Sequence, residues 1–292
     1  MTRLRSPIQW FGGKGRMISK LLPLLPRCHT WVEVFGGGAS LTMARQPSPV
    51  EVYNDLDGDL CAFFRVLADE ELFARFYRRV GLLPYAREIY NEYRASWREC
   101  DDPVERAARW FVVARQSFSG IFALSWGTMV TASCRGMSAS CSCWLSCLEM
   151  LPEIHARLLR VQIENSDFRV ILDRYDTPDT LFYCDPPYVQ STRRDGGYTC
   201  EMSDADHREL VELLLTRRGM CVLSGYASEL YLPLEDAGWL RMDFQTVCHA
   251  AGRTRNSNLQ GEGAALAMQS RTESVWRNPA AMIAQGRLDF NP

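Results

Sequence analysis

The sequence predicts an α/β fold with a helical insertion, and three features support this. Residues 31–60 contain two strand–turn–helix units, residues 60–160 contain amphipathic segments without strand alternation, and strands alternate with helices again after residue 160. Strands that alternate with helices form a mainly parallel sheet with helices on its faces. We therefore expect a discontinuous α/β domain built from residues 1–60 and 160–292, and a helical domain formed by residues 61–159.

The composition is that of a globular protein. Apolar residues make up 47% and charged residues 23% of the 292 residues, which argues against disorder and against a coiled coil. No apolar run approaches the length of a membrane span, and the apolar stretch 21–26 is short and interrupted by Pro23 and Pro26. We expect a cytoplasmic protein with neither a secretory signal nor a membrane segment.

Eleven cysteines are many for a chain in which we expect no export signal, and the expectation is reduced thiols. The cluster of Cys134, Cys141, Cys143 and Cys147 lacks the CxxC spacing of zinc sites, and the nearest histidine, His155, lies outside it. We expect thiols that pack in a helix or loop, and no metal site.

The first unit combines a short strand, a glycine turn and a helix. Residues 31–38 read Trp-Val-Glu-Val-Phe-Gly-Gly-Gly and precede a helical stretch at 39–45. A second strand at 50–53 ends next to Asp55, and a further helix begins near Asp57. Asp55 follows the glycine loop by about 20 residues, a spacing that in nucleotide-binding βαβ units places a carboxylate on the ribose hydroxyls.

The insertion is expected to consist of helices and one loop. Amphipathic segments rich in arginine and aromatic residues cover 72–80, 86–97 and 104–113. The Ser-, Gly- and Cys-rich segment 125–147 predicts a loop with a short helix.

Strand patterns return in the last third of the chain. They cover 161–164, 180–184 and 220–224, and a helical pattern at 204–217 separates the last two. Residues 271–276, which contain Glu273, are expected to form the last strand of the sheet and to be structural.

The strongest chemical signal is Asp185-Pro186-Pro187-Tyr188, directly after an apolar strand. Open α/β sheets bind their ligands at the carboxyl ends of the strands. The two prolines fix the backbone and remove two N–H donors, so rigid carbonyl acceptors remain beside a carboxylate and an aromatic ring. This combination predicts a cup for a flat base that carries an amino group. The alternative is a proline-rich turn that closes the strand.

Four elements in this order resemble the Dam-type (alpha-class) DNA adenine methyltransferases. The elements are Trp10-Phe-Gly-Gly-Lys14, Phe35-Gly-Gly-Gly38, Asp55 and Asp185-Pro-Pro-Tyr188, and the resemblance extends to about Asn278. It implies a Rossmann-like methyltransferase fold with a helical target-recognition insertion. It also implies transfer of a methyl group from S-adenosylmethionine to the 6-amino group of an adenine flipped out of duplex DNA, with S-adenosylhomocysteine as the product. A role with or without a cognate restriction endonuclease stays open.

The same resemblance implies the site residues. The implied catalytic residues are Asp185, Pro186, Pro187 and Tyr188. The implied cofactor-binding residues are Trp10, Lys14, Phe35, Gly36, Gly38, Asp55, Asp167, Phe168 and Asp185. The two glycines would let the backbone approach the cofactor. A solvated loop lysine for Lys14, a core aromatic for Trp10 and a helix N-cap for Asp167 are the open alternatives.

In the implied mechanism, the adenine amine donates hydrogen bonds to the Asp185 carboxylate and the Pro186 carbonyl. These bonds draw the nitrogen toward a tetrahedral geometry and localise its lone pair, while Tyr188 stacks on the base. Most of the acceleration comes from positioning, and no step requires a metal.

DNA binding requires a local basic surface, because the net charge of −2 gives no general attraction. The candidate residues are Arg115, Arg135, Arg193, Arg194, Arg253 and Arg255, with Arg106 and Arg109 on the same helix as Arg115. Arg135 is a candidate for reading a guanine. Solvated helix faces and loops are the alternative for each. Segment 115–122 departs from that of GATC-specific members, so the resemblance does not extend to a GATC target and the recognition sequence stays open.

Three other functions remain to be tested. Related enzymes that methylate cytosine usually have Ser at the position of Asp185. Those that methylate RNA or a protein glutamine usually have Asn there. A DNA-binding repressor that lost catalysis is disfavoured by the complete set of site residues.

Overall fold

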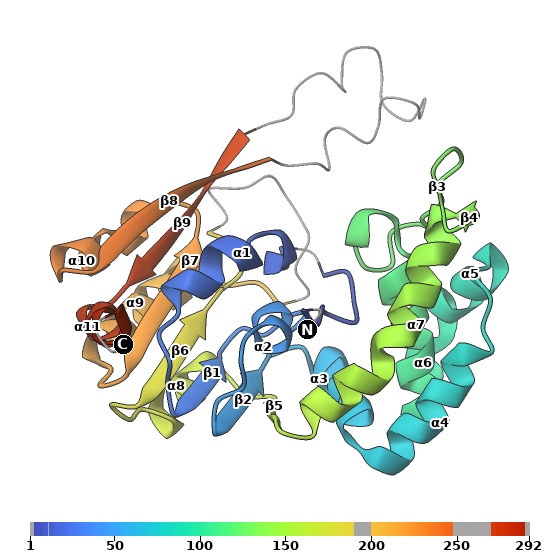
Figure 1. Cartoon of the computed structure of the whole chain (residues 1–292), viewed down its shortest axis with the longest axis horizontal. Helices are drawn as coiled ribbons and strands as arrows, with labels where there is room; N and C mark the ends of the chain where they lie inside the picture. The colour runs from blue at the N-terminus through green and yellow to red at the C-terminus, as the bar shows by residue number, and fades with distance from the viewer. Residues whose placement is uncertain (1–2, 11, 190–199, 248–269, 290–292) are drawn as a thin grey trace.

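The structure, a computed structural model, describes residues 3–10, 12–189, 200–247 and 270–289. A seven-stranded sheet flanked by helices lies beside a block of helices (Figure 1). The colours in Figure 1 show that the sheet is built from both ends of the chain and the helical block from its middle. The predicted α/β, Rossmann-like fold is confirmed.

The sheet has the strand order β5-β2-β1-β6-β7-β9-β8. The strands are β1 Thr30–Glu33, β2 Val50–Asn54, β5 Gln162–Glu164, β6 Thr180–Cys184, β7 Met220–Gly225, β8 Leu240–Val247 and β9 Ser270–Arg277. Among them β9 runs antiparallel to both its neighbours, and the other adjacent pairs are parallel. The chain order reverses between β1 and β6, and such a switch point leaves a crevice at the carboxyl ends of the strands.

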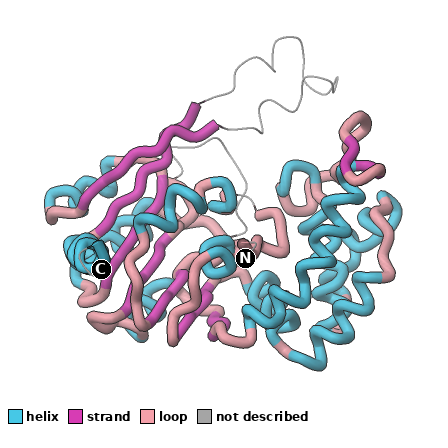
Figure 2. Tube along the Cα trace, viewed as in Figure 1, coloured by secondary structure: helices cyan, strands magenta, loops and turns pink. Residues whose placement is uncertain are grey.

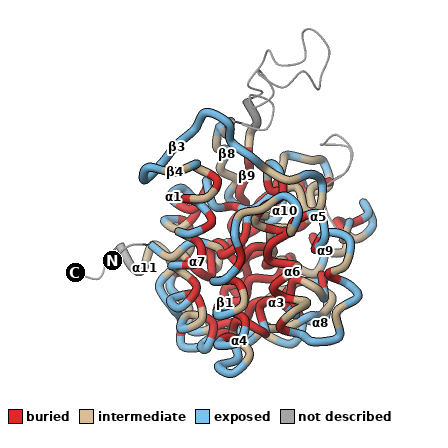
Figure 3. Tube along the Cα trace, turned by 90° about the vertical axis from the view of Figure 1, so that its right-hand side faces the viewer, coloured by how far each residue is buried: buried red, intermediate tan, exposed pale blue. Residues whose placement is uncertain are grey.

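Both faces of the central strands are covered, which explains their apolar sequences. Successive residues of a strand point to opposite faces, and the two faces of the sheet carry separate core clusters. Val32 and Phe182 belong to one cluster, and Trp31, Leu181 and Tyr183 belong to the other. Figure 3 shows the buried interior that results.

Helices of four to thirteen residues accompany the sheet. They are α1 Ile18–Leu21, α2 Ser40–Ala44, α8 Phe168–Arg174, α9 Asp204–Thr216, α10 Leu232–Asp236 and α11 Pro279–Asp289. The 3-10 turns are η1 Lys14–Arg16, η2 Leu22–Leu24, η3 Trp97–Glu99, η4 Phe118–Gly120 and η6 Glu229–Tyr231. No helix of the described ranges is long and apolar enough to cross a membrane.

Five helices of 10 to 20 residues form the helical block between β2 and β5 (Figure 2). They are α3 Gly58–Ala68, α4 Glu70–Gly81, α5 Arg87–Ser96, α6 Pro103–Gln116 and α7 Ala139–Leu158. The Asp57 carboxylate caps the first of them by accepting bonds from the N–H groups of Asp59 and Leu60. Phe63 and Phe111 stack in the core of the block with ring centroids 5.5 Å apart. The three predicted helices at 72–80, 86–97 and 104–113 are confirmed as α4, α5 and α6.

The core of the block continues under the sheet domain. Tyr53 of β2 packs on Phe64 of α3, with ring centroids 4.8 Å apart. On the other side, the Arg157 guanidinium of α7 binds the buried carboxylate of Glu51 at 2.5 and 2.8 Å and the carbonyl of Thr42 at 2.8 Å. These contacts hold α3 and α7 directly against β2.

Segment 125–147 differs from its prediction as a loop with a short helix. It contains a small hairpin, β3 Ser133–Cys134 and β4 Met137–Ser138, followed by the first half of a 20-residue helix, α7. Arg135 and Gly136 both have positive φ, 54° and 75°, as a two-residue hairpin turn requires. The helix contains poor helix formers and Pro152, and burial of residues such as Trp144 and Leu151 stabilises it instead.

The described cysteines are free thiols. Cys147 of α7 is buried, whereas Cys134 and Cys143 are exposed. In the part of the chain that the structure describes, no group of three or more His, Cys, Asp or Glu side chains is placed to hold a metal ion.

Candidate active site

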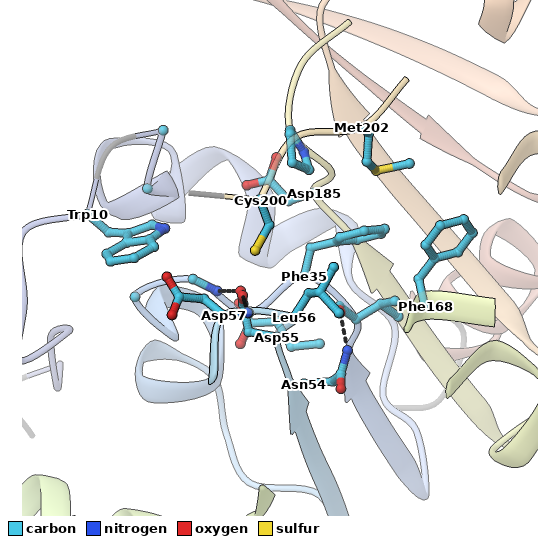
Figure 4. A pocket seen from close by; sticks show the side chains of 18 of the residues that line it. Trp10, Phe35, Asn54, Asp55, Leu56, Asp57, Phe168, Asp185, Cys200 and Met202 are labelled. Carbon is cyan, nitrogen blue, oxygen red and sulfur yellow. Dashed lines mark hydrogen bonds between the residues drawn. The ribbon is translucent and has the colours of Figure 1, made fainter. Parts of the chain in front are cut away.

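A pocket opens at the carboxyl ends of β1, β2, β5 and β6 (Figure 4), where the strand order predicts the ligand crevice. It is lined by segments that are far apart in the sequence. They are residues 10 and 12–14, residues 33–38 and 40 with the glycine loop, residues 54–57, residues 166–169, residues 185 and 187, and residues 200–202 and 206. All nine predicted cofactor-binding residues line it.

The glycine loop follows β1 and lies on the ring of Tyr53. A Cβ atom on Gly36 would lie 2.1 Å from that ring, and the Tyr53 hydroxyl donates to the carbonyl of Gly37 at 2.8 Å. Gly37 has φ +47°, and a Cβ there would lie 2.8 Å from the Trp10 ring. The loop therefore requires glycine for its own packing, a different reason from the approach to a cofactor that the sequence suggested for Gly36 and Gly38.

We expect Gly36→Ala to lower the free energy of unfolding by about 1 to 3 kcal/mol, because the methyl group would collide with the buried ring of Tyr53. Thermal unfolding measures the effect. Gly81→Ala is the matched control, because no atom lies within 4 Å of the methyl group it adds. Equal melting temperatures for the two variants would contradict this account of the loop.

Asp55 lies at the end of β2 and faces the glycine loop. Its Oδ2 accepts a bond from the N–H of Gly37 at 2.8 Å, and its Oδ1 accepts one from the N–H of Asp57 at 2.9 Å. A carboxylate has about four lone-pair sites, so Asp55 can accept a further bond from a ligand in the pocket. Burial raises the pKa of Asp55 to about 6, and the backbone hydrogen bonds oppose this rise.

The far end of the pocket is apolar. The rings of Phe35 and Phe168 lie 5.6 Å apart, and Leu56 and Met202 line the pocket with them. This end offers an apolar surface against which a flat ring system can pack.

Asp167 has two contacts in the structure. Its carboxylate caps α8 by accepting the N–H of Arg169 at 2.8 Å, so the N-cap alternative is confirmed. It also pairs with the Arg169 guanidinium at 3.0 Å, and that group bridges to Asp206 and Glu209 of α9, both at 2.6 Å. Asp167 lines the pocket at the same time, so the cap does not exclude a ligand contact.

Asp185 lies at the end of β6 and is bound by two donors through one oxygen. Oδ1 accepts Lys14 Nζ at 2.5 Å and the Ser224 hydroxyl of β7 at 3.1 Å. Within the described ranges, no residue donates a hydrogen bond to Oδ2, the second oxygen of this carboxylate. Burial raises the pKa of Asp185 to about 6, although Lys14 lowers it; Glu273 raises it further.

Lys14 is buried, with 5% of its surface exposed, so a solvated loop lysine is excluded. Besides Asp185, its ammonium group contacts the Tyr188 hydroxyl at 2.8 Å and Glu273 Oε1 of β9 at 3.0 Å. Desolvation lowers the pKa of Lys14, but the neighbouring negative charges raise it well above its usual value. The lysine is therefore held in its charged form.

The prolines and Tyr188 complete the motif at the edge of the pocket. Pro187 lines the pocket, and Pro186 is buried behind it. The Tyr188 hydroxyl donates to Glu273 at 2.9 Å, and its ring lies 4.1 Å from that of Tyr226. The Tyr188 side chain is partly exposed, and the predicted stacking on a base requires such exposure.

Trp10 is partly buried and lines the pocket. Its ring packs near Trp110 of α6, with centroids 6.3 Å apart, so it joins the pocket to the helical block.

The structure describes only some of the predicted DNA-binding arginines. Arg135 is exposed on the hairpin turn and pairs with Glu149 at 3.1 Å. Arg115 is half-buried and donates to the carbonyl of Cys143 at 3.3 Å. Arg106 and Arg109 are engaged in ion pairs within the block. The other four candidates, Arg193, Arg194, Arg253 and Arg255, lie outside the described residues.

Sequence reasoning missed several residues of the site. Ser224 lies near the end of β7 and Tyr226 follows that strand, and no distinctive pattern in the sequence identifies either of them. Glu273 carried a usable signal, because it shares a strand face with the buried Val275. An acid on the buried face of a strand points to a partner in the interior.

The sequence of the pocket and of the helical block matches a known family. The model of the D12 class N6 adenine-specific DNA methyltransferases matches residues 10–228, a stretch that includes the glycine loop, the helical block and Asp185. The chain belongs to this class. The D12 match ends at the start of the segment after β7 and does not reach Glu273.

The chain is also similar to the DNA N-6-adenine-methyltransferase of Escherichia phage P1. The two are 26% identical over 238 residues, which cover 75% of this D12 chain and 29% of the phage protein. The chain thus spans less than a third of the length of that relative.

Proposed function

We propose that this D12 protein transfers a methyl group from S-adenosylmethionine to the 6-amino group of an adenine flipped out of duplex DNA. The observation that carries the proposal is the arrangement of Asp185. One of its oxygens is held by Lys14 and Ser224, and the carboxylate lines a pocket next to rigid prolines and a partly exposed tyrosine ring.

The pocket fits the proposed cofactor. The apolar surface formed by Phe35, Phe168 and Met202 suits an adenine ring, and the Asp55 carboxylate can accept a bond from a ribose hydroxyl. S-adenosylmethionine would supply a methyl group on a positively charged sulfur. Carboxylates of Glu33, Asp55, Asp57 and Asp185 line the pocket, so its field favours a cation over the neutral product.

The residues of the chain would then position and polarise the amine. Oδ2 of Asp185 and the carbonyl of Pro186 are the proposed acceptors for its two protons, and the Tyr188 ring is the proposed platform for the base. The ion pair with Lys14 keeps Asp185 from turning away. Most of the acceleration would come from this positioning.

The helical block is the proposed target-recognition domain, with the boundaries given above. Figure 1 shows the β3–β4 hairpin and the β8 and β9 ends on the same side of the molecule. Arg135 at the hairpin turn is proposed to contact a base or a phosphate of the DNA. Its ion pair with Glu149 would be broken when the DNA binds. A cognate endonuclease remains an open partner.

Activity is expected to depend on the ionisation of Asp185. Burial raises its pKa to about 6 in the free protein, and the protonated carboxyl group loses its charge as an acceptor. We therefore expect kcat/KM to fall about fivefold between pH 6 and pH 5 and to be nearly level above pH 7. Rates measured between pH 5 and 8, with melting temperatures at each pH as a control, test this. A level profile down to pH 5 would contradict it.

An incorporation assay tests the function itself. The purified chain is incubated with methyl-labelled S-adenosylmethionine and adenine-containing duplex DNA, and label in DNA is compared with that from Asp185→Ala. Label above the variant supports an enzyme. DNA binding with no label above the variant would favour the repressor.

A further inference from the structure

Glu273 of β9 lies beneath the Asp185–Tyr188 motif. It is 4% exposed, and it reaches two residues of the proposed site at once. Its carboxylate accepts the Tyr188 hydroxyl at 2.9 and 3.0 Å and pairs with Lys14 Nζ at 3.0 Å. It thus links the last strand of the sheet to the motif after β6.

The ammonium group of Lys14 has three N–H donors. Three acceptors of the chain lie within hydrogen-bond distance: Asp185 at 2.5 Å, Tyr188 at 2.8 Å and Glu273 at 3.0 Å. Asp185 and Tyr188 accept hydrogen bonds from this ammonium group, and Glu273 forms an ion pair with it. In this arrangement Lys14 orients side chains of the site.

The stability of the fold alone does not explain why Glu273 lies beside Lys14 as a second carboxylate. Asp185 already neutralises Lys14, so Glu273 adds a buried charge that the ion pair does not need. A buried charge lowers stability unless hydrogen bonds compensate for it. Burial and the charge of Glu273 both raise the pKa of Asp185, and ionisable groups perturbed in this way are concentrated at functional sites.

The geometry also explains which oxygen of Asp185 is left for a ligand. Lys14 binds Oδ1, and Glu273 contacts the same ammonium group and so helps to fix its position. The same carboxylate fixes the direction of the Tyr188 ring through the hydroxyl. Loss of Glu273 would free both groups.

We propose that Glu273 is a positioning residue of the methyl-transfer site, which fixes Lys14 and the Tyr188 ring and thereby presents Oδ2 of Asp185 to the target base. This inference rests on the proposed function, because it assigns Glu273 a part in that reaction. Glu273 touches neither substrate nor cofactor and acts through its two neighbours.

The test uses Glu273→Gln, which keeps the size of the side chain and an acceptor for Tyr188 but removes the charge facing Lys14. Asp243→Asn on β8 is the matched control, because Asp243 is a partly exposed acid bound to Ser274 and Arg241 away from the site. Single-turnover methyl transfer is expected to slow about 10- to 100-fold in Glu273→Gln and to be unchanged in the control. Affinity for S-adenosylhomocysteine, measured by calorimetry, is expected to change less than about threefold.

A second readout does not depend on activity. Lys14 and Lys20 are the two lysines of the chain, so selective 15N-lysine labelling yields two side-chain signals. Lys20 is exposed and serves as an internal reference. In Glu273→Gln the ammonium signal of Lys14 is expected to shift and to exchange faster with water, while that of Lys20 stays in place.

A third variant tests whether Glu273 acts through the Tyr188 hydroxyl. Tyr188→Phe removes that hydroxyl, and the double variant Tyr188→Phe with Glu273→Gln is expected to lose less than the product of the single effects. Independent effects would overturn this link. An unchanged Lys14 signal with an unchanged rate would overturn the proposal as a whole, as would a parallel loss of rate, ligand affinity and melting temperature.

Failure of the proposed function is distinguishable from failure of this inference. An unmodified chain that transfers no methyl group overturns both. An active chain whose Glu273→Gln variant matches it overturns the positioning role alone.

Discussion

Asp185→Asn is expected to lower the rate of methyl transfer by about 10³-fold, the size of effect seen when one polarising group is removed from a catalytic site. The amide replaces a charged acceptor with a neutral group that also presents N–H donors toward the amine of the base. Lys14 would keep Glu273 as its charge partner at 3.0 Å, so the fold is expected to survive. Single-turnover transfer at saturating cofactor measures the rate.

Asp179→Asn is the control for Asp185→Asn. Asp179 is an exposed acid that directly precedes β6, whereas Asp185 directly follows this strand at the pocket. The substitution of Asp179 is expected to leave the rate unchanged. A rate for Asp185→Asn within threefold of the unmodified chain would remove this carboxylate from the proposed mechanism.

Tyr188→Ala is expected to lose turnover more than cofactor affinity. Stacking on a flipped base contributes about 1 to 3 kcal/mol, which corresponds to a loss of about 10- to 100-fold in kcat/KM for DNA. The variant also removes the hydroxyl that bridges Lys14 and Glu273, so the loss is expected at the upper end of this range. Steady-state kinetics with varied DNA and calorimetry with S-adenosylhomocysteine separate the two quantities.

Tyr77→Ala on α4 is the control, because Tyr77 is 39% exposed and packs on Phe73 away from the pocket. An equal loss of cofactor affinity and turnover in Tyr188→Ala would contradict a role on the base. It would place the ring on the cofactor instead.

Much of the sheet could be predicted because its strands have strong local patterns. The strand 180–184 was predicted with its exact bounds, since five buried apolar or β-branched residues precede a proline pair. The helix at 204–217 begins with the capping box of Ser203 and Asp206, a signal visible in the sequence. The edge strand β8 was not predicted, because it is only partly buried and mixes charged with apolar residues.

Other features depend on contacts between distant segments. The 20-residue α7 is stabilised by burial against α3 and α4 and not by its Ser- and Cys-rich composition, so local patterns gave a shorter helix. The contact of Lys14 with Glu273 joins residues at opposite ends of the chain. No pattern within one segment contains such a pair, and the same holds for Asp185 and Ser224.

The identity of the methylated base tests the central claim most directly. Duplex DNA treated with the purified chain and S-adenosylmethionine is digested to nucleosides and analysed by mass spectrometry, with Asp185→Asn as the control. We predict N6-methyldeoxyadenosine in the DNA treated with the unmodified chain and none above background with the variant. Methyl groups on cytosine, or no methylated nucleoside at all, would contradict the proposed function.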